Sequence, residues 1–184
     1  TIQGSDTGIT ASELTTISNA TTVAIDASAV TGLASDTAAN IKTLLTAGND
    51  TAQFTGASFE SLATAVVSDT TLSGSELAGA IDQANTATGG TGTVFTISAV
   101  NTITGSEADF TDLLTDEGNT QIEITDQTLT VNTGEVSVST ARALSQTTTG
   151  TVTGTITSGT TIAAMLHSSS LSLIHISEPT RLQQ

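Results

Sequence analysis

The sequence predicts an α/β repeat protein, in which short strands and short helices stack side by side as a solenoid. Three observations support this prediction: a helix-start pattern recurs, strand centres are regularly spaced, and the apolar residues are mostly small and aliphatic. Such spacing and composition are typical of stacked repeats, in which each unit buries its apolar face on its neighbours. The uneven unit lengths leave an irregular α+β or β-rich domain as the alternative.

The segment from Val66 to Ile97 defines the unit most clearly. Val66 opens a strand that closes at a Ser-Asp pair, and Ser-Gly-Ser-Glu at 73–76 predicts the capped start of a short helix. A loop of small residues at 85–93 leads to the next strand, at 94–97. The predicted unit is therefore strand, tight turn, capped helix, loop and strand.

The helix-start pattern is an apolar residue, Ser or Thr, a small residue, and then Ser-Glu. It occurs at 9–14, 72–77 and 103–108. A hydroxyl accepts hydrogen bonds from the free amides of a first turn, and an acid is favourable near that positive helix end. We therefore interpret Glu13, Glu76 and Glu107 as capping residues rather than as acid–base carboxylates.

Predicted strand centres lie at Ile25, Phe54, Val67, Ile97, Ile124 and Thr155. Apart from the step between Phe54 and Val67, they are about 27–31 residues apart, as stacked repeats require. We expect these strands to share one thin aliphatic interior while the acids face water.

Further elements are predicted in the N-terminal half. Ala38, Ile41, Leu44 and Leu45 fall on one face of a helix over 35–45. Gly-Asn-Asp at 48–50 ends this helix. Phe59, Leu62, Ala63 and Val66 then restart a helical spacing, so the next strand is expected to begin only at Val67.

The C-terminal half alternates in the same way. Residues 121–126 alternate apolar and polar side chains, which predicts a half-exposed strand, and Leu129 and Val131 extend the alternation. Val152 and Ile156 predict another strand, and 161–166 another short helix.

Composition excludes several functions. Asp and Glu total 18 against 3 Lys and Arg, a net charge of −15. Nucleic-acid binding needs cationic side chains, so it is excluded, and binding to anionic lipid is disfavoured. There are no cysteines, and no apolar run is long enough to insert across a membrane.

The domain organisation is one repeat region over 1–171, which we interpret as a fragment of a longer chain because residue 1 is not Met. Residues 172–184 break the pattern and hold the single proline. This tail resembles the translated read-through of a sequencing adapter that ends many assembled environmental reading frames. We interpret it as non-native and exclude it from the fold.

The candidate metal ligands are Asp26, Asp69 and Asp126, which end predicted strands at comparable places. Equivalent positions of a solenoid form a column, and Ca²⁺ prefers carboxylate oxygens. The alternative is that each Asp bonds the amides of the following turn. Beyond calcium, no cofactor is indicated. His167 has no second ligand at helical spacing, so neither a zinc site nor a catalytic triad is supported, and we expect a non-enzyme.

Thr-x-Thr runs, such as 151–153 and 155–157, suggest an ice-binding face. In the sequence these runs do not recur in each unit, and helices are expected to interrupt a flat face. The β-propensity of threonine is then a sufficient explanation.

Three phrases, at 22–31, 35–41 and 67–77, carry a family resemblance. They are similar to repeats of very long extracellular and cell-surface proteins of marine bacteria and cyanobacteria. The resemblance implies an extracellular or cell-surface location and a structural or adhesive role. The implied partners are neighbouring repeats of the same chain and other surface proteins or glycans. Alternatives are a calcium-dependent adhesin module, a fragment of a secreted hydrolase, or a phage fibre.

Overall fold

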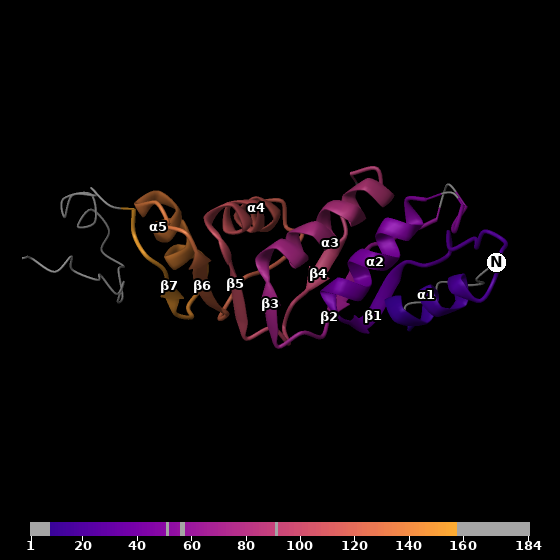
Figure 1. Cartoon of the computed structure of the whole chain (residues 1–184), viewed down its shortest axis with the longest axis horizontal. Helices are drawn as coiled ribbons and strands as arrows, with labels where there is room; N and C mark the ends of the chain where they lie inside the picture. The colour runs from indigo at the N-terminus through magenta and orange to yellow at the C-terminus, as the bar shows by residue number, and fades with distance from the viewer. Residues whose placement is uncertain (1–7, 51, 56–57, 91, 158–184) are drawn as a thin grey trace, which may run out of the picture.

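The helices follow one another along the long axis of an elongated molecule (Figure 1). The computed structural model describes residues 8–50, 52–55, 58–90 and 92–157. Its helices are α1 (Ala11–Asn19), α2 (Ala38–Gly48), α3 (Gly74–Ala87), α4 (Glu107–Gly118) and α5 (Val138–Thr147). Each helix contacts the next along the chain.

The strands form two parallel sheets. The first contains β1 (Gly32–Asp36), β2 (Thr64–Val67) and β4 (Val94–Thr96), in the order β1-β2-β4. The second contains β3 (Thr71–Ser73), β5 (Thr102–Ser106), β6 (Thr128–Thr133) and β7 (Val152–Thr153), in the order β3-β5-β6-β7. The described residues therefore form an α/β fold of two parallel sheets and five helices, which confirms the predicted α/β character.

Strand pairing joins each segment to a later one. Leu33 of β1 lies opposite Ala65 of β2, and Ala65 lies opposite Phe95 of β4. An isolated parallel bridge between Ile25 and Phe54 continues the same arrangement. Because the paired strands are parallel, the chain must cross over between them, and helices supply most of these crossovers.

One continuous hydrophobic core runs through the described chain. Ile25, Ile97 and Ile124 are all buried members of it, as expected for a shared aliphatic interior. Four aromatic rings add to the aliphatic side chains, and Phe54 and Phe59 lie with their ring centroids 5.2 Å apart. The core therefore spans both sheets and the inner faces of the helices.

The prediction of a helix over 35–45 is wrong at its start. β1 continues to Asp36, Thr37 is the N-cap, and α2 begins at Ala38. The Thr37 hydroxyl accepts from the Asn40 amide, and Asp36 accepts from the Thr37 amide. These short-range bonds fix the boundary three residues later than the apolar spacing indicates.

The helical spacing at Phe59 is also misleading. Phe59 lies in a turn with a φ of 66°, a left-handed conformation that no α-helix continues through. β2 then begins at Thr64, before the predicted Val67. The short helix predicted after 73–76 is longer than expected, because α3 continues to Ala87, into the loop predicted at 85–93.

Residues 121–126 form no strand. The Gln127 side-chain oxygen accepts from the amides of Thr125, at 2.8 Å, and Asp126, at 3.3 Å. These amides are therefore satisfied by a side chain rather than by a neighbouring strand. The predicted alternation still describes burial, since Ile122 and Ile124 are buried and Glu123 is exposed. The helix predicted over 161–166 lies outside the described residues.

Candidate functional site

Carboxylates join the N-terminal ends of helices to segments far along the chain, and we call these bonds the carboxylate links. The Ser12 amide of α1 donates to Asp36 Oδ2 at 2.7 Å, across 24 residues. The Ala38 amide of α2 donates to Asp69 Oδ2 at 2.8 Å, across 31 residues. Helix N-termini expose free amides and a positive dipole end, so a carboxylate from the next unit is stabilising there.

The third carboxylate link runs in the opposite direction. Glu107 is the first residue of α4, and its Oε1 accepts from the Ser137 amide at 3.0 Å, across 30 residues. Ser137 is the N-cap of α5, so this acid serves the helix that follows its own. Hydrogen bonds from Ser137 and Thr140 lower the pKa of Glu107. Glu107 therefore lies in the first turn of α4, where the pattern places it, but its hydrogen bonds stabilise the start of α5 rather than its own helix.

The other predicted caps differ in outcome. Thr10 and Glu13 form a complete capping box on α1, and hydrogen bonds from Thr10 lower the pKa of Glu13, which confirms that prediction. On α4 the capping box uses Ser106 and Asp109. At α3 the N-cap Ser73 makes no side-chain capping bond, although Glu76 lies in the first turn.

Buried hydroxyls form a second kind of connection between units. Thr93 Oγ1 donates to the Leu62 carbonyl at 3.0 Å, and Thr148 Oγ1 donates to the Gln127 carbonyl at 2.7 Å. Ser58 Oγ accepts from the Ala27 amide at 3.1 Å. Each hydroxyl satisfies a buried backbone group of another segment, and an unsatisfied group there would be costly.

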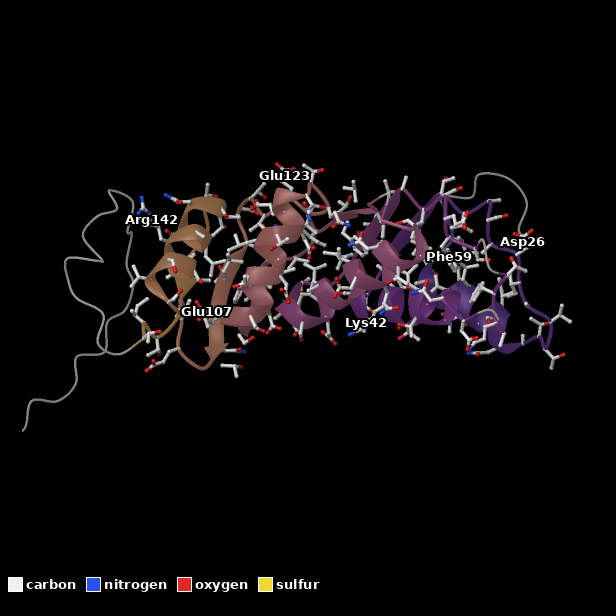
Figure 2. All side chains as sticks on the ribbon, turned by 90° about the horizontal axis from the view of Figure 1, so that it is seen from above. Asp26, Lys42, Phe59, Glu107, Glu123 and Arg142 are labelled. Atoms are coloured by element: carbon white, nitrogen blue, oxygen red, sulfur yellow. The ribbon has the colours of Figure 1, made fainter. Side chains whose placement is uncertain are left out.

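The structure does not bring the three predicted calcium ligands together. Asp26 accepts from the amide and hydroxyl of Ser28, which lowers its pKa, and Asp69 belongs to a carboxylate link. Asp126 accepts from the Thr125 hydroxyl at 3.3 Å. Asp26 lies near the N-terminal end of the molecule (Figure 2). Within the described ranges, no group of three or more His, Cys, Asp or Glu side chains could hold a metal ion.

Asp116 is a buried acid, contrary to the expectation that the acids face water. It lies on the inner side of α4 and is 8% exposed. Burial, followed by the nearby carboxylates of Asp82 and Asp112, raises its pKa to about 6. Position 116 lies three residues after the buried Leu113, and this helical spacing is the signal that could have indicated burial.

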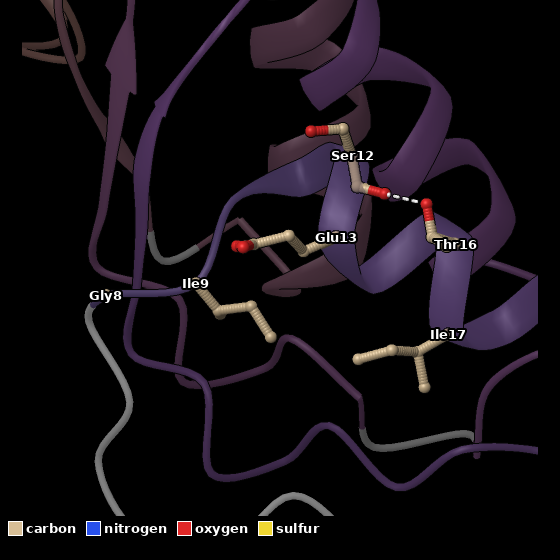
Figure 3. Close-up of a pocket in the computed structure, with 6 residues that line it drawn as sticks. All are labelled: Gly8, Ile9, Ser12, Glu13, Thr16 and Ile17. Atoms are coloured by element: carbon tan, nitrogen blue, oxygen red, sulfur yellow. Dashed lines mark hydrogen bonds between the residues drawn. The ribbon is translucent and has the colours of Figure 1, made fainter.

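An open pocket lies against α1 (Figure 3). Its lining residues are Gly8, Ile9, Ser12, Glu13, Thr16 and Ile17. Glu13 is the titratable side chain of this set, and its carboxylate already accepts from the Thr10 amide at 2.9 Å. The lining therefore offers no pair of groups for acid–base catalysis.

Comparison of the chain with models of known protein families, with curated proteins and with solved structures found no match. Among the residues that the structure describes, none of the helices has the length and apolar character to cross a lipid bilayer.

Proposed function

We propose that this chain is a non-enzymatic structural and adhesive module of a secreted or cell-surface repeat protein. Its strand–helix units would form a solenoid-like stack, with neighbouring repeats of the same chain as the first partners. Other surface proteins or glycans would be the external partners.

The observation that carries the proposal is the order of contacts along the chain. The helices pack in sequence order from α1 to α5, and both sheets are extended strand by strand through parallel pairing. An assembly in which each unit contacts its neighbours can lengthen by adding units, which suits a surface spacer. The carboxylate links and buried hydroxyls reinforce the same contacts between units.

The net charge supports a role at a surface exposed to solvent. A charge of −15 keeps such a module soluble and repels its copies from one another. The described side chains form no metal-binding group, and the pocket on α1 holds no reacting pair. The resemblance of the sequence to repeats of long bacterial surface proteins agrees with this role.

Stacking is tested by placing a charge in the shared core. Ile97→Asp puts a carboxylate at a position that is 3% exposed, and we expect several units to unfold together. Val94→Asp is the matched control, because Val94 is 46% exposed. Melting followed by circular dichroism should show a large fall in melting temperature for Ile97→Asp and little change for Val94→Asp. Equal melting temperatures would contradict the stacked core.

Adhesion is tested directly with the purified chain coupled to inert microspheres in a flow cell. We expect retention on glycan-coated or bacterial surfaces above that of microspheres carrying an inert acidic protein. Retention that disappears on chelation would favour the calcium-dependent adhesin instead. Retention equal to the inert control on every surface would contradict the adhesive role.

A further inference from the structure

Two rows of hydroxyl side chains cross the second sheet in register. In the first row, Thr71 of β3 lies opposite Thr102 of β5, which lies opposite Thr128 of β6. The second row contains Ser73, Thr104, Thr130 and Thr153, from β3, β5, β6 and β7. The structure thus brings Thr-x-Thr or Thr-x-Ser segments together on neighbouring strands, contrary to the expectation that such runs do not recur from unit to unit.

The rows lie on the outer face of the sheet. Leu72, Ile103 and Leu129 are the residues between the two rows, and they are at most 2% exposed within the core. Since side chains alternate across a strand, the rows point away from that core. Thr102, Thr104, Thr128 and Thr130 are all partly exposed. The helices contact the sheet through the core side, so they do not interrupt the outer face.

The hydroxyls of the row threonines make no hydrogen bond within the described chain. These threonines are Thr71, Thr102, Thr104, Thr128, Thr130 and Thr153. The exposed helical threonines behave differently, because their hydroxyls donate to the carbonyl four residues earlier, as Thr43 does to Ala39 and Thr111 to Glu107. The hydroxyls of these six threonines therefore remain available to an external partner, whereas the helical ones are already used. The Ser73 hydroxyl is the exception in the rows, because it is hydrogen-bonded to the Ser75 hydroxyl at 2.7 Å.

Spacing and charge indicate what the partner is. Parallel strands are about 4.8 Å apart and alternate residues along a strand about 6.6 Å apart, so the rows form a two-dimensional lattice of methyl and hydroxyl groups. Neither row contains a charged residue, although the protein carries a net charge of −15. A charged side chain would hold its own hydration shell, whereas threonine presents one hydroxyl and one methyl group to ordered water.

We propose that this outer face of β3-β5-β6-β7 binds the surface of ice. Each threonine hydroxyl of the rows hydrogen-bonds to a water of the crystal surface, and the neighbouring threonine methyl groups occupy the spaces between these waters. A polysaccharide surface is less suitable, because the chain has no Trp or Tyr on which sugar rings could stack. The inference goes beyond the proposed adhesive role and is independent of it.

The test is partition of the purified full chain into slowly growing ice, together with inhibition of ice recrystallisation. We expect the protein to enter the ice and Thr104→Lys/Thr130→Lys to be left in the liquid. Thr43→Lys/Thr111→Lys is the matched control, because it adds the same charge at exposed helical threonines. This control should partition as the wild type does.

A second variant separates binding from folding. Thr104→Val/Thr130→Val keeps β-branched side chains, so we expect the fold to persist by circular dichroism while ice partition falls. The proposal is overturned if the wild type stays in the liquid. It is also overturned if the helical control loses as much partition as the row variant, or if the chain sediments with crystalline chitin or cellulose and not with ice.

Discussion

The N-terminal and C-terminal regions of this molecule stack the same kinds of element with different side chains. In the N-terminal region α2 buries Ile41, Leu44 and Leu45, and the Phe54–Phe59 ring pair lies in the same core. In the C-terminal region α5 buries only Ala141 and Leu144 among its described residues. The helix of the N-terminal region therefore buries more apolar area than the helix at the C-terminal end, although two of the three carboxylate links also lie in the N-terminal region.

Two buried aspartates, one in each region, show how the surroundings of an acid decide its pKa. Asp36, in the N-terminal region, and Asp116, in the C-terminal region, are each 8% exposed. Burial alone would raise the pKa of Asp36, but hydrogen bonds donated by Asn40, Ser12 and Thr37 outweigh it and hold that pKa below its ordinary value. Among the described residues no donor bonds to the Asp116 carboxylate, and burial together with the carboxylates of Asp82 and Asp112 raises its pKa to about 6. Equal exposure thus accompanies opposite shifts, because donors surround one acid and like charges surround the other.

The largest expected effect tests the aromatic packing of the N-terminal region. Phe59→Ala should lower the free energy of unfolding by about 3–5 kcal/mol, because it removes a fully buried ring beside Phe54. Leu144→Ala, in α5, should cost less, about 2 kcal/mol. Urea denaturation measures both. Equal losses would show that the two regions are packed equally well.

Asp36→Asn should have the next largest effect, a loss of about 1–3 kcal/mol in the free energy of unfolding at pH 7, because the part-buried bonds from the Ser12 and Thr37 amides lose their charged acceptor. The folded-state pKa is lowered from 3.8, so this stabilisation is present above that pH and is lost as the pH falls through the folded value. Urea titrations at pH 7 and pH 3 provide the measurement. If the free energies of unfolding of wild type and variant differed by the same amount at both pH values, the link between Asp36 and Ser12 would be contradicted.

Gly48→Ala tests how closely α2 approaches the ring pair. A Cβ at Gly48 would lie 2.6 Å from the Phe59 ring, so we expect a loss of about 1–3 kcal/mol from overpacking. Gly79→Ala is the matched control, because the added Cβ meets only the flexible end of Lys42. That variant should be neutral or gain up to about 1 kcal/mol from helix propensity. A loss in the control equal to that at Gly48 would contradict the close contact.

Asp116→Asn should have the smallest effect and the opposite sign. Its raised pKa means that the folded state favours the protonated acid, so the charged form costs stability once the pH exceeds the ordinary value of 3.8, increasingly up to about 6. The variant should gain about 1–2 kcal/mol at pH 7, allowing for partial solvation, and almost nothing at pH 4. Unfolding titrations at both values measure this. An equal gain in the free energy of unfolding at pH 7 and pH 4 would exclude titration of Asp116 as the cause.

Local patterns predicted the elements whose boundaries depend on neighbouring residues. The capping box at Thr10 and Glu13 and the start of α4 after Ser106 follow from side chains three or four positions apart. The shared aliphatic interior follows from the burial of alternating residues such as Ile122 and Ile124. These features required no knowledge of distant partners.

The remaining features depend on partners far along the chain. The carboxylate links join residues 24, 31 and 30 positions apart, and they run backward from Asp36 and Asp69 but forward from Glu107. No fixed period or residue type marks them. The missing strand at 121–126 has the same origin, because a buried Gln127 captures amides that periodicity assigns to a sheet.

The carboxylate links also determine how the protein should respond to ionic strength. They join acids to neutral backbone amides rather than to lysine or arginine, so dissolved ions have little attraction between opposite charges to weaken. What the ions do weaken is the repulsion among the other acids of a chain with net charge −15. A fold connected in this way gains stability in brine, where one held by ion pairs would lose it.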